Sequence, residues 1–179
     1  QGRPIHTGVK FEVTNDSVSA IAVDGFRLAR RTYHPETETG RQLSFVVPAA
    51  GLKEVEKILT DSDEDVAFTL GSKHILYQIG GATLVCRLLE GEFLDYKNAI
   101  PRKNPISLVA DTKSLIRSID RVSVVISDKL KSPVRCTFDY DKVSLSAKTG
   151  NGEAKDVCRL SGDGTGLEIG FNNRYLMEA

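Results

Sequence analysis

The sequence of 179 residues has no excess of charge of either sign, because 24 Lys and Arg balance 24 Asp and Glu. That balance excludes a protein coated in positive charge, as a histone-like DNA binder would be, and an acidic solvating tail. No apolar run approaches the ~20 residues that a membrane-spanning helix requires, and the N-terminus does not resemble a signal peptide. At 40% hydrophobic and 27% charged residues, the composition is that of a soluble globular protein.

Cysteine and histidine are scarce, and neither is spaced as in a metal site. The three cysteines are an odd number, lie far apart and include no CxxC pair, which favours reduced thiols in a cytosolic protein over a disulfide or zinc framework. None of the three histidines has ligand-like spacing to a cysteine or carboxylate. We therefore expect no metal and no cofactor. The chain opens with Gln-Gly-Arg-Pro and its one methionine is Met177, which is typical of an excerpt or a processed product.

Alternating apolar residues predict a chain made mostly of short strands. We expect strands at 9–13, 18–22, 43–47, 65–70, 74–79, 82–89, 106–110, 134–139, 143–148, 155–160 and 166–170. Asp24-Gly25 is a strong hairpin signal, and Gly80-Gly81 indicates a second turn. Helical spacing of apolar residues is confined to 52–59, 112–127 and 172–179. The pattern predicts an α+β fold with predominantly antiparallel sheet and few helices.

The chain also resembles itself. Residues 8–29 match 133–154 at an offset of 125, so that Asp16 and Gly25 meet Asp141 and Gly150. At an offset of 124, residues 43–54 match 167–178. An offset held through a hairpin, a strand and a helix start indicates an internal duplication. The two copies join near 98–105, where Pro101, Pro105 and basic residues are typical of a linker.

Signals for catalysis are weak. Glu90, Glu92 and Asp95 could supply a carboxylate pair for general acid–base work, but solvated carboxylates are common at the end of a strand. The glycine-rich 162–166 has no following Lys-Ser/Thr and precedes a strand, so we interpret it as a hairpin loop rather than a phosphate cradle. We find no nucleophile elbow in the sequence.

One helix is locally basic. Lys113, Arg117 and Arg121 recur at every fourth residue and so form one ridge opposite the apolar stripe. Segment 112–131 carries five basic residues against two acidic ones. The ridge is either a solvated helix face or a patch that follows a phosphate backbone without reading bases.

Four motifs resemble the family of the bacterial DNA polymerase III beta subunit, the sliding clamp. They are RPIHTGV (3–9), AVDGFRLA (22–29), LEGEFLDY (89–96) and EIGFNNRYL (168–176), in the family's order and spacing. The resemblance implies repeated clamp domains, with antiparallel sheets outside and a few helices lining the inner face. Residues 1–100 would be a middle domain without its N-terminal strand and helix. Residues 101–179 would be a C-terminal domain without its C-terminal half.

The resemblance further implies a non-enzymatic, cytoplasmic and nucleoid-associated bacterial replication factor. Members of the family form homodimeric rings around duplex DNA without reading its sequence. They tether the polymerase III alpha subunit, the clamp loader, other polymerases and repair proteins through short linear peptides. The matching peptide-binding positions are His6, Gly8, Val23, Gly25, Phe26, Arg27, Leu28, Leu94, Asn98, Ala99, Asn172 and Tyr175. An apolar groove beside the 22–29 hairpin would take the peptide's hydrophobic anchors.

Other roles come from the same matching. Arg3, Lys113, Arg117 and Arg121 would face DNA, and Val125 and Ile126 would approach the subunit interface. The sequence departs from the family at Val23 and Phe26, where Thr and His are usual, and at Ala49-Ala50, where basic residues are usual. His6, Leu94 and Asn98 likewise replace an apolar residue, a proline and a basic residue. These changes put peptide preference and inner-surface charge in doubt.

Two alternatives stay open from the residues alone. One is a β-rich hydrolase that uses Glu90, Glu92 and Asp95. The other is a repeat-built adaptor that binds peptides but not DNA.

Overall fold

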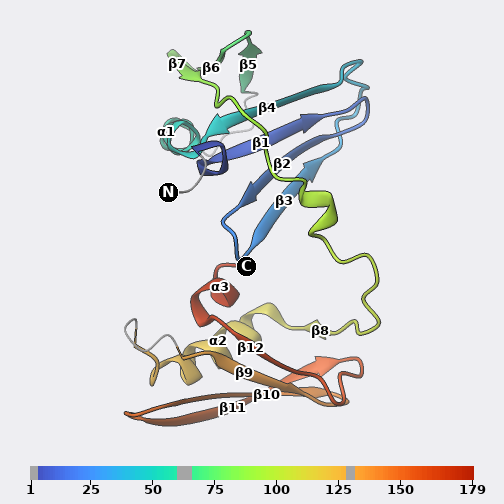
Figure 1. Cartoon of the computed structure of the whole chain (residues 1–179), viewed down its shortest axis with the longest axis vertical. Coiled ribbons are helices and arrows are strands. Elements are labelled where there is room, and N and C mark those ends of the chain that lie inside the picture. Colours follow the sequence, from blue (N-terminus) through green and yellow to red (C-terminus); the bar gives the residue numbers. More distant parts are fainter. Residues whose placement is uncertain (1–3, 60–65, 128–131) are drawn as a thin grey trace. The chain divides into compact units, whose positions relative to one another are not determined.

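The computed structural model describes residues 4–59, 66–127 and 132–179. The chain divides into two compact units, unit 1 at residues 1–100 and unit 2 at residues 101–179, and each is described by itself (Figure 1). No helix among the described residues is long and apolar enough to cross a membrane.

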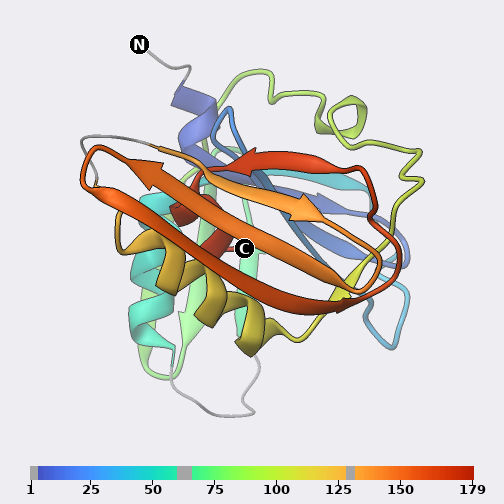
Figure 2. The ribbon, with the colours of Figure 1, turned by 90° about the horizontal axis from the view of Figure 1, so that it is seen from below.

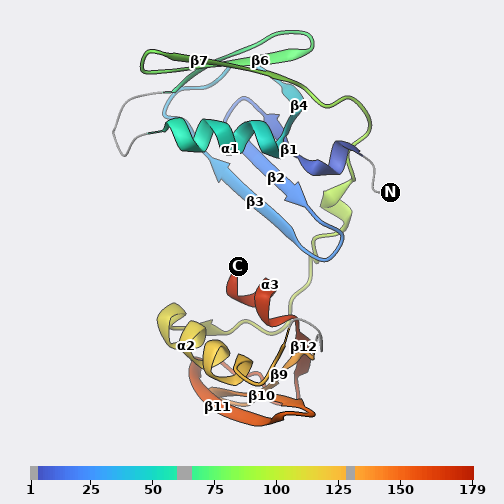
Figure 3. The same ribbon diagram turned by 90° about the vertical axis from the view of Figure 1, so that its left-hand side faces the viewer.

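The described residues of unit 1 form two antiparallel sheets and one α-helix. Its elements are η1 (Pro4–Thr7), β1 (Gly8–Val13), β2 (Val18–Val23), β3 (Leu28–Tyr33), β4 (Leu43–Pro48), α1 (Ala49–Ile58), β5 (Ala67–Leu70), β6 (His74–Ile79), β7 (Ala82–Arg87) and η2 (Tyr96–Asn98). The strand orders are β3-β2-β1-β4 and β5-β6-β7. Figure 3 shows α1 running at an angle to strands β2 and β3 of the first sheet.

The core of unit 1 joins α1 to both sheets. Phe45 and Val47 of β4 pack with Val55 of α1 and with Ile75 and Tyr77 of β6. The β4 residues are the buried side chains of a strand, and Val55 is the buried side chain of an amphipathic helix. Burial of these apolar side chains is what holds the three elements together.

A close approach of α1 to β7 depends on one glycine. A Cβ atom at Gly51 would stand 2.6 Å from Sγ of Cys86. Glycine therefore lets the helix backbone lie directly against β7.

In unit 2, residues 101–127 and 132–179 form one five-stranded sheet and two helices. Its elements are β8 (Val109–Ala110), α2 (Thr112–Ser123), β9 (Val134–Phe138), β10 (Lys142–Thr149), β11 (Gly152–Ser161), β12 (Glu168–Phe171) and α3 (Asn173–Met177). The strand order is β12-β9-β10-β11-β8. Helix α2 runs across one face of this sheet (Figure 2) and buries Ile119 and Val122 against it.

The strand pairing confirms the internal duplication. Val13 pairs with Val18 in unit 1, and the residues 125 positions later, Phe138 and Val143, pair in unit 2. Val23 pairs with Leu28, and Lys148 with Glu153 at the same offset. The order β3-β2-β1-β4 is thus repeated as β11-β10-β9-β12.

Three expectations need correction. The Gly162–Gly166 segment is not a hairpin loop, because β11 and β12 lie on opposite sides of β9 and β10, and the segment crosses between them. The strand expected at 106–110 starts at Val109, and the helix expected to reach 127 ends at Ser123. Both elements are shorter because apolar pattern does not fix where hydrogen bonding ends.

The other predicted helices and strands are present with shifted ends. The helix expected at 172–179 spans Asn173–Met177. The strand expected at 65–70 is β5, and its first expected residue lies outside the described residues.

Candidate functional site: the hairpin rim and the basic helix

The hairpin between β2 and β3 presents an aromatic side chain to solvent. Phe26 stands in the four-residue loop that joins the strands, not in β3, and is 84% exposed. Gly25 beside it has φ +83°, a left-handed conformation that favours glycine. Val23 and Leu28 close the hairpin as paired, half-buried residues. The hairpin signal is therefore confirmed, with Phe26 at its tip.

Asp24 holds the shape of this loop. Its Oδ1 accepts hydrogen bonds from the backbone amides of Phe26 (3.2 Å) and Arg27 (3.1 Å). Its Oδ2 accepts a 2.7 Å bond from Nε of Arg27. The Arg27 hydrogen bond is the main cause that lowers the pKa of Asp24. The carboxylate stays ionised and fixes the backbone that carries Phe26.

The second group of predicted peptide-binding residues lies at 93–99, a stretch we call the rim segment. Leu94 is 46% exposed, and Asn98 and Ala99 are exposed as well. Asn98 donates a 2.6 Å hydrogen bond from Nδ2 to Oδ2 of Asp95. His6 of η1 is half-buried, and its ring centroid lies 5.6 Å from that of Phe93. These contacts bring His6 next to the rim segment.

Gly8 and Asn172 have structural reasons for their identity. A Cβ atom at Gly8 would stand 2.7 Å from the carbonyl oxygen of Val47 and 2.8 Å from Cδ1 of Leu89. Asn172 is the N-cap of α3, where its Oδ1 accepts from the amides of Arg174 (3.0 Å) and Tyr175 (3.3 Å). A peptide-binding role of Gly8, Asn172 and Tyr175 stays a prediction.

The three basic residues of the α2 ridge are exposed, but they differ in how far other side chains neutralise their charge. Lys113, Arg117 and Arg121 are all exposed. Arg121, however, donates from Nε to Oδ2 of Asp156 on β11 at 2.7 Å, and from a terminal nitrogen to Oγ of Ser118 at 3.2 Å. Nε of Arg117 donates to the carbonyl of Lys113 at 3.2 Å, along the helix surface. Lys113 and Arg117 therefore carry most of the outward positive charge of the ridge.

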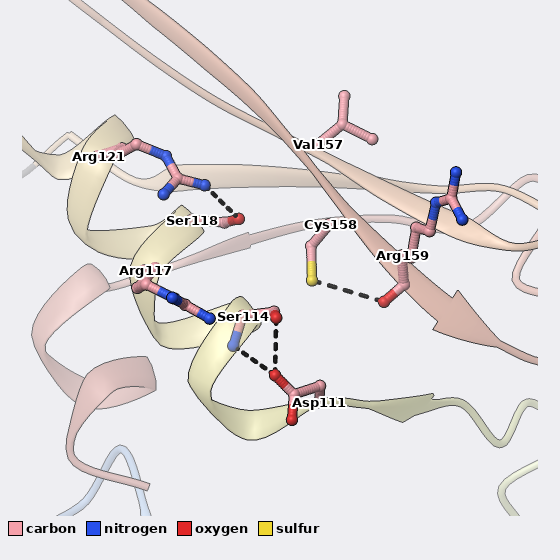
Figure 4. Close-up of a pocket in the computed structure, with 8 residues that line it drawn as sticks. All are labelled: Asp111, Ser114, Arg117, Ser118, Arg121, Val157, Cys158 and Arg159. Carbon is pink, nitrogen blue, oxygen red and sulfur yellow. Dashed lines mark hydrogen bonds between the residues drawn. The ribbon is translucent and has the colours of Figure 1, made fainter.

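A groove of about 380 Å³ lies where α2 meets β11. Figure 4 shows Ser114, Ser118 and Arg121 on the helix and Cys158 on the strand, with Asp111 at the helix N-terminus. Asp111 caps α2 by accepting from the amide (2.9 Å) and the hydroxyl (2.7 Å) of Ser114. The hydrogen bonds from Ser114 lower the pKa of Asp111. The polar side of the groove is thus already engaged in holding the helix.

The predicted interface residues are partly engaged within unit 2. The carbonyl of Val125 accepts a 3.0 Å hydrogen bond from Oγ1 of Thr149, and Ile126 packs on the unit 2 core. The neighbouring Val124 is 83% exposed, and sequence reasoning passed over it. An apolar residue two positions after Val122, where the helical apolar stripe ends, was the signal that could have found it. Arg3, predicted to face DNA, lies outside the described residues.

The geometry of the described part of the chain does not favour the hydrolase alternative. Glu90 and Glu92 are exposed at the mouth of a groove of about 460 Å³, and Asp95 is bound to Asn98. Among the residues that the structure describes, no group of three His, Cys, Asp or Glu could hold a metal ion.

The architecture places the chain in the class of duplicated, β-rich proteins that carry helices on one face of their sheets. Two family models match it in succession. The DNA polymerase III beta subunit central domain matches residues 1–95, and the C-terminal domain of the same subunit matches residues 97–179. The chain therefore belongs to the DNA polymerase III beta subunit family, and the resemblance seen in the sequence is confirmed.

Relatives and solved structures agree with this assignment. The Beta sliding clamp proteins of Staphylococcus epidermidis and Staphylococcus aureus are 29% and 28% identical over 179 residues. These matches cover 99% of this chain and 47% of each relative, so the chain spans about half the length of the curated relatives it matches. The DNA polymerase III subunit beta of Pseudomonas aeruginosa has 27% identity and a TM-score of 0.91, covering 99% of this chain and 49% of that one. The Bacillus subtilis DNA polymerase sliding clamp has 26% identity and a TM-score of 0.90, covering 100% and 48%. The expected fold of repeated clamp domains with antiparallel sheets and few helices is confirmed.

Proposed function

We propose that the chain is part of a replication processivity factor, a clamp that encircles duplex DNA and has no catalytic step of its own. The observation that carries the proposal is the match of two consecutive domains, in order, to the beta subunit family. A ring holds DNA by topology, so weak and salt-sensitive electrostatic contact suffices and sliding stays easy. We place this activity in the bacterial cytoplasm, at the nucleoid. In the full-length protein we expect a homodimer, with Val125 and Ile126 near its interface.

The DNA-facing part of the proposal rests on α2. Lys113 and Arg117 present exposed positive charge, and contacts between cations and phosphates carry no sequence information, so this surface suits sequence-independent DNA binding. The test is fluorescence anisotropy with two duplexes of unrelated sequence over a range of salt concentrations. We expect equal, weak binding, with dissociation constants on the order of 10⁻⁴–10⁻⁶ M that rise steeply with salt. Nanomolar binding to one sequence in moderate salt would contradict the clamp.

The partner-binding part rests on the exposed hairpin tip and the rim segment. A Pseudomonas aeruginosa DnaN sliding clamp, 27% identical with a TM-score of 0.90, is described as bound to griselimycin. We propose that this chain also binds griselimycin, and partner peptides of the polymerase III alpha subunit, the clamp loader and other polymerases and repair proteins, beside Phe26 and Leu28. An exposed aromatic flanked by half-buried aliphatic residues can anchor hydrophobic side chains of a peptide.

Calorimetric titration with griselimycin tests this site. We expect Phe26→Ala and Leu28→Ala each to weaken binding by about tenfold, the loss typical of truncating an anchor residue. Tyr140→Ala is the matched control, because Tyr140 is an aromatic of unit 2 that is also strongly exposed, at 70%. Equal affinity of the parent and both hairpin variants would reject the site. Griselimycin binding without any salt-dependent DNA binding would favour the adaptor alternative instead.

A further inference from the structure

The backbone of Tyr96 is hydrogen-bonded to two other residues of the rim segment. Its backbone amide donates to the carbonyl of Leu94 at 2.8 Å, and its own carbonyl accepts from the amide of Ala99 at 3.0 Å. Two of the three predicted peptide-binding residues of the segment are therefore hydrogen-bonded directly to the Tyr96 backbone. The position of Tyr96 decides where Leu94 and Ala99 lie.

The side chain of Tyr96 is anchored in β1, far away in the sequence. It is only 1% exposed, and its hydroxyl donates a 2.6 Å hydrogen bond to Oε2 of Glu12, 84 residues earlier. Glu12 is in turn held by Nζ of Lys10, which lies 2.8 Å from Oε1. A hydrogen bond to an ionised carboxylate is shorter and stronger than one between neutral groups. A part-buried hydrogen bond thus ties the segment to an inner strand of the sheet.

Lys10 of β1 also contacts the rim segment directly, through two aromatic rings. Its Nζ stands 5.8 Å from the ring centroid of Phe93 and 5.6 Å from that of Tyr96. A cation at this distance from an aromatic face is attracted to it. Leu94 therefore lies between two aromatic residues that are both held by β1. Figure 1 shows the chain after β7 crossing the sheet that contains β1.

The strand that anchors the segment also organises the hairpin. β1 pairs with β2 over Lys10–Val13, and β2 pairs with β3 up to Val23 and Leu28. We propose that Glu12 and Tyr96 are positioning residues for peptide binding, because their bond sets the rim segment relative to the hairpin. This inference rests on the proposed peptide site. It assigns a role in binding to two residues that do not have to touch the peptide.

Griselimycin binding to the 179-residue chain tests the role. Tyr96→Phe keeps the buried ring and removes the hydroxyl, and Glu12→Gln keeps an acceptor oxygen and removes the charge. Tyr96→Phe is expected to weaken binding by about threefold to tenfold. Without the hydroxyl the rim segment is less ordered in the free chain, so more conformational entropy is lost when the peptide binds. Glu12→Gln is expected to weaken it in the same direction and by less.

The matched control is Tyr77→Phe. It is the same chemical change in the same unit, at a buried hydroxyl without a hydrogen-bond partner among the described residues, and it should leave affinity unchanged. Amide hydrogen exchange distinguishes local loosening of the rim segment from a general loss of stability, which would speed exchange throughout unit 1. In Tyr96→Phe the amides of Tyr96 and Ala99 should exchange faster, while those of β1 and β2 keep their protection.

Each outcome decides a different point. A parent chain that does not bind griselimycin overturns the proposed peptide site and this role with it. A parent that binds, with Tyr96→Phe and Glu12→Gln binding equally well, overturns the positioning role alone. An equal loss in Tyr77→Phe also overturns it, because the effect would then belong to any buried hydroxyl of the unit.

Discussion

Asp156 of β11 accepts a 2.7 Å hydrogen bond from Nε of Arg121 and forms an ion pair with a terminal nitrogen of the same side chain at 2.5 Å. Lys113, Arg117 and Arg121 are therefore evenly spaced in the sequence, but in the fold only the charge of Arg121 is neutralised by Asp156. Burial opposes ionisation of Asp156, but hydrogen bonds from the Val157 amide and from Arg121 outweigh it and lower the pKa of the carboxyl. At neutral pH the carboxylate neutralises one of the three cations that face outward from α2.

Asp156→Asn is expected to strengthen binding to duplex DNA, because it releases the charge of Arg121. Arg117→Gln should weaken it and lower the salt dependence, since one phosphate contact contributes roughly one unit to the slope of log K against log salt. Anisotropy titrations of both variants and the parent, at several salt concentrations, measure this. Lys155→Gln on the same strand is the control, as its ammonium is already paired with Glu153. If Asp156→Asn binds DNA no better than the parent, α2 is not the DNA-facing surface.

Alkaline pH should destabilise unit 1 through Tyr96. Burial, followed by the hydrogen bond to Glu12, raises its pKa from 10.0 to about 12. Because the folded state resists ionisation that the unfolded chain accepts, the stabilisation is complete below pH 10 and is lost as the pH rises from 10 to about 12.

The near-ultraviolet absorbance of phenolate measures this ionisation directly. Burial likewise raises the pKa of Tyr77 to about 12, so two of the five tyrosines should ionise late. Tyr96→Phe should remove one late step and Tyr77→Phe the other. A titration in which all tyrosines of the folded chain ionise near pH 10 would contradict the burial of both.

Tyr77→Phe should leave the fold equally stable or make it more stable. The hydroxyl of Tyr77 is buried with no hydrogen-bond partner among the described residues, and an unsatisfied buried polar group costs about 1–3 kcal/mol. Removing it while keeping the ring should raise the free energy of unfolding by up to about 1 kcal/mol. Urea denaturation of parent and variant measures the difference. A loss above about 1 kcal/mol would mean that the hydroxyl is satisfied in solution.

The sequence predicted the features that depend on local residue patterns and on the internal repeat. Alternation located the strands, and the offset of 125 located the two copies, whose pairs Val13–Val18 and Phe138–Val143 are equivalent in the structure. The hairpin at Asp24-Gly25 followed from its turn residues. The ridge of Lys113, Arg117 and Arg121 followed from helical spacing.

Long-range polar contacts could not be predicted from the sequence, because the alternation of apolar and polar residues does not show which strand lies beside which helix. Glu12 and Tyr96 are 84 residues apart, and Arg121 and Asp156 are 35 apart. One signal was available for the second pair. Asp156 occupies the same face of β11 as Ala154 and Cys158, which are directed inward, and a carboxylate in an apolar row requires a partner. The crossing segment at Gly162–Gly166 was misread for the same reason, since strand order was unknown.

Gly8→Ala tests how tightly the start of β1 is packed. An added Cβ would lie 2.7 Å from both Cγ1 of Val46 and the carbonyl oxygen of Val47, and 2.8 Å from Cδ1 of Leu89. A side chain can turn away, but the Val47 carbonyl belongs to the ladder that joins β1 to β4, so the backbone would have to move. We expect a loss of about 1–3 kcal/mol in the free energy of unfolding, as for other overpacked sites.

Gly81→Ala is the matched control for this substitution, because a Cβ there would have nothing within 4 Å. Urea denaturation of the two variants against the parent separates packing from the general effect of replacing glycine in this unit. Because Leu89 hydrogen-bonds Val46 just before the rim segment, Gly8→Ala should also weaken griselimycin binding, and Gly81→Ala should not. If Gly8→Ala is as stable as Gly81→Ala, the strands have room to part at this point. The close approach of β1 to β4 would then not be the reason for glycine at position 8.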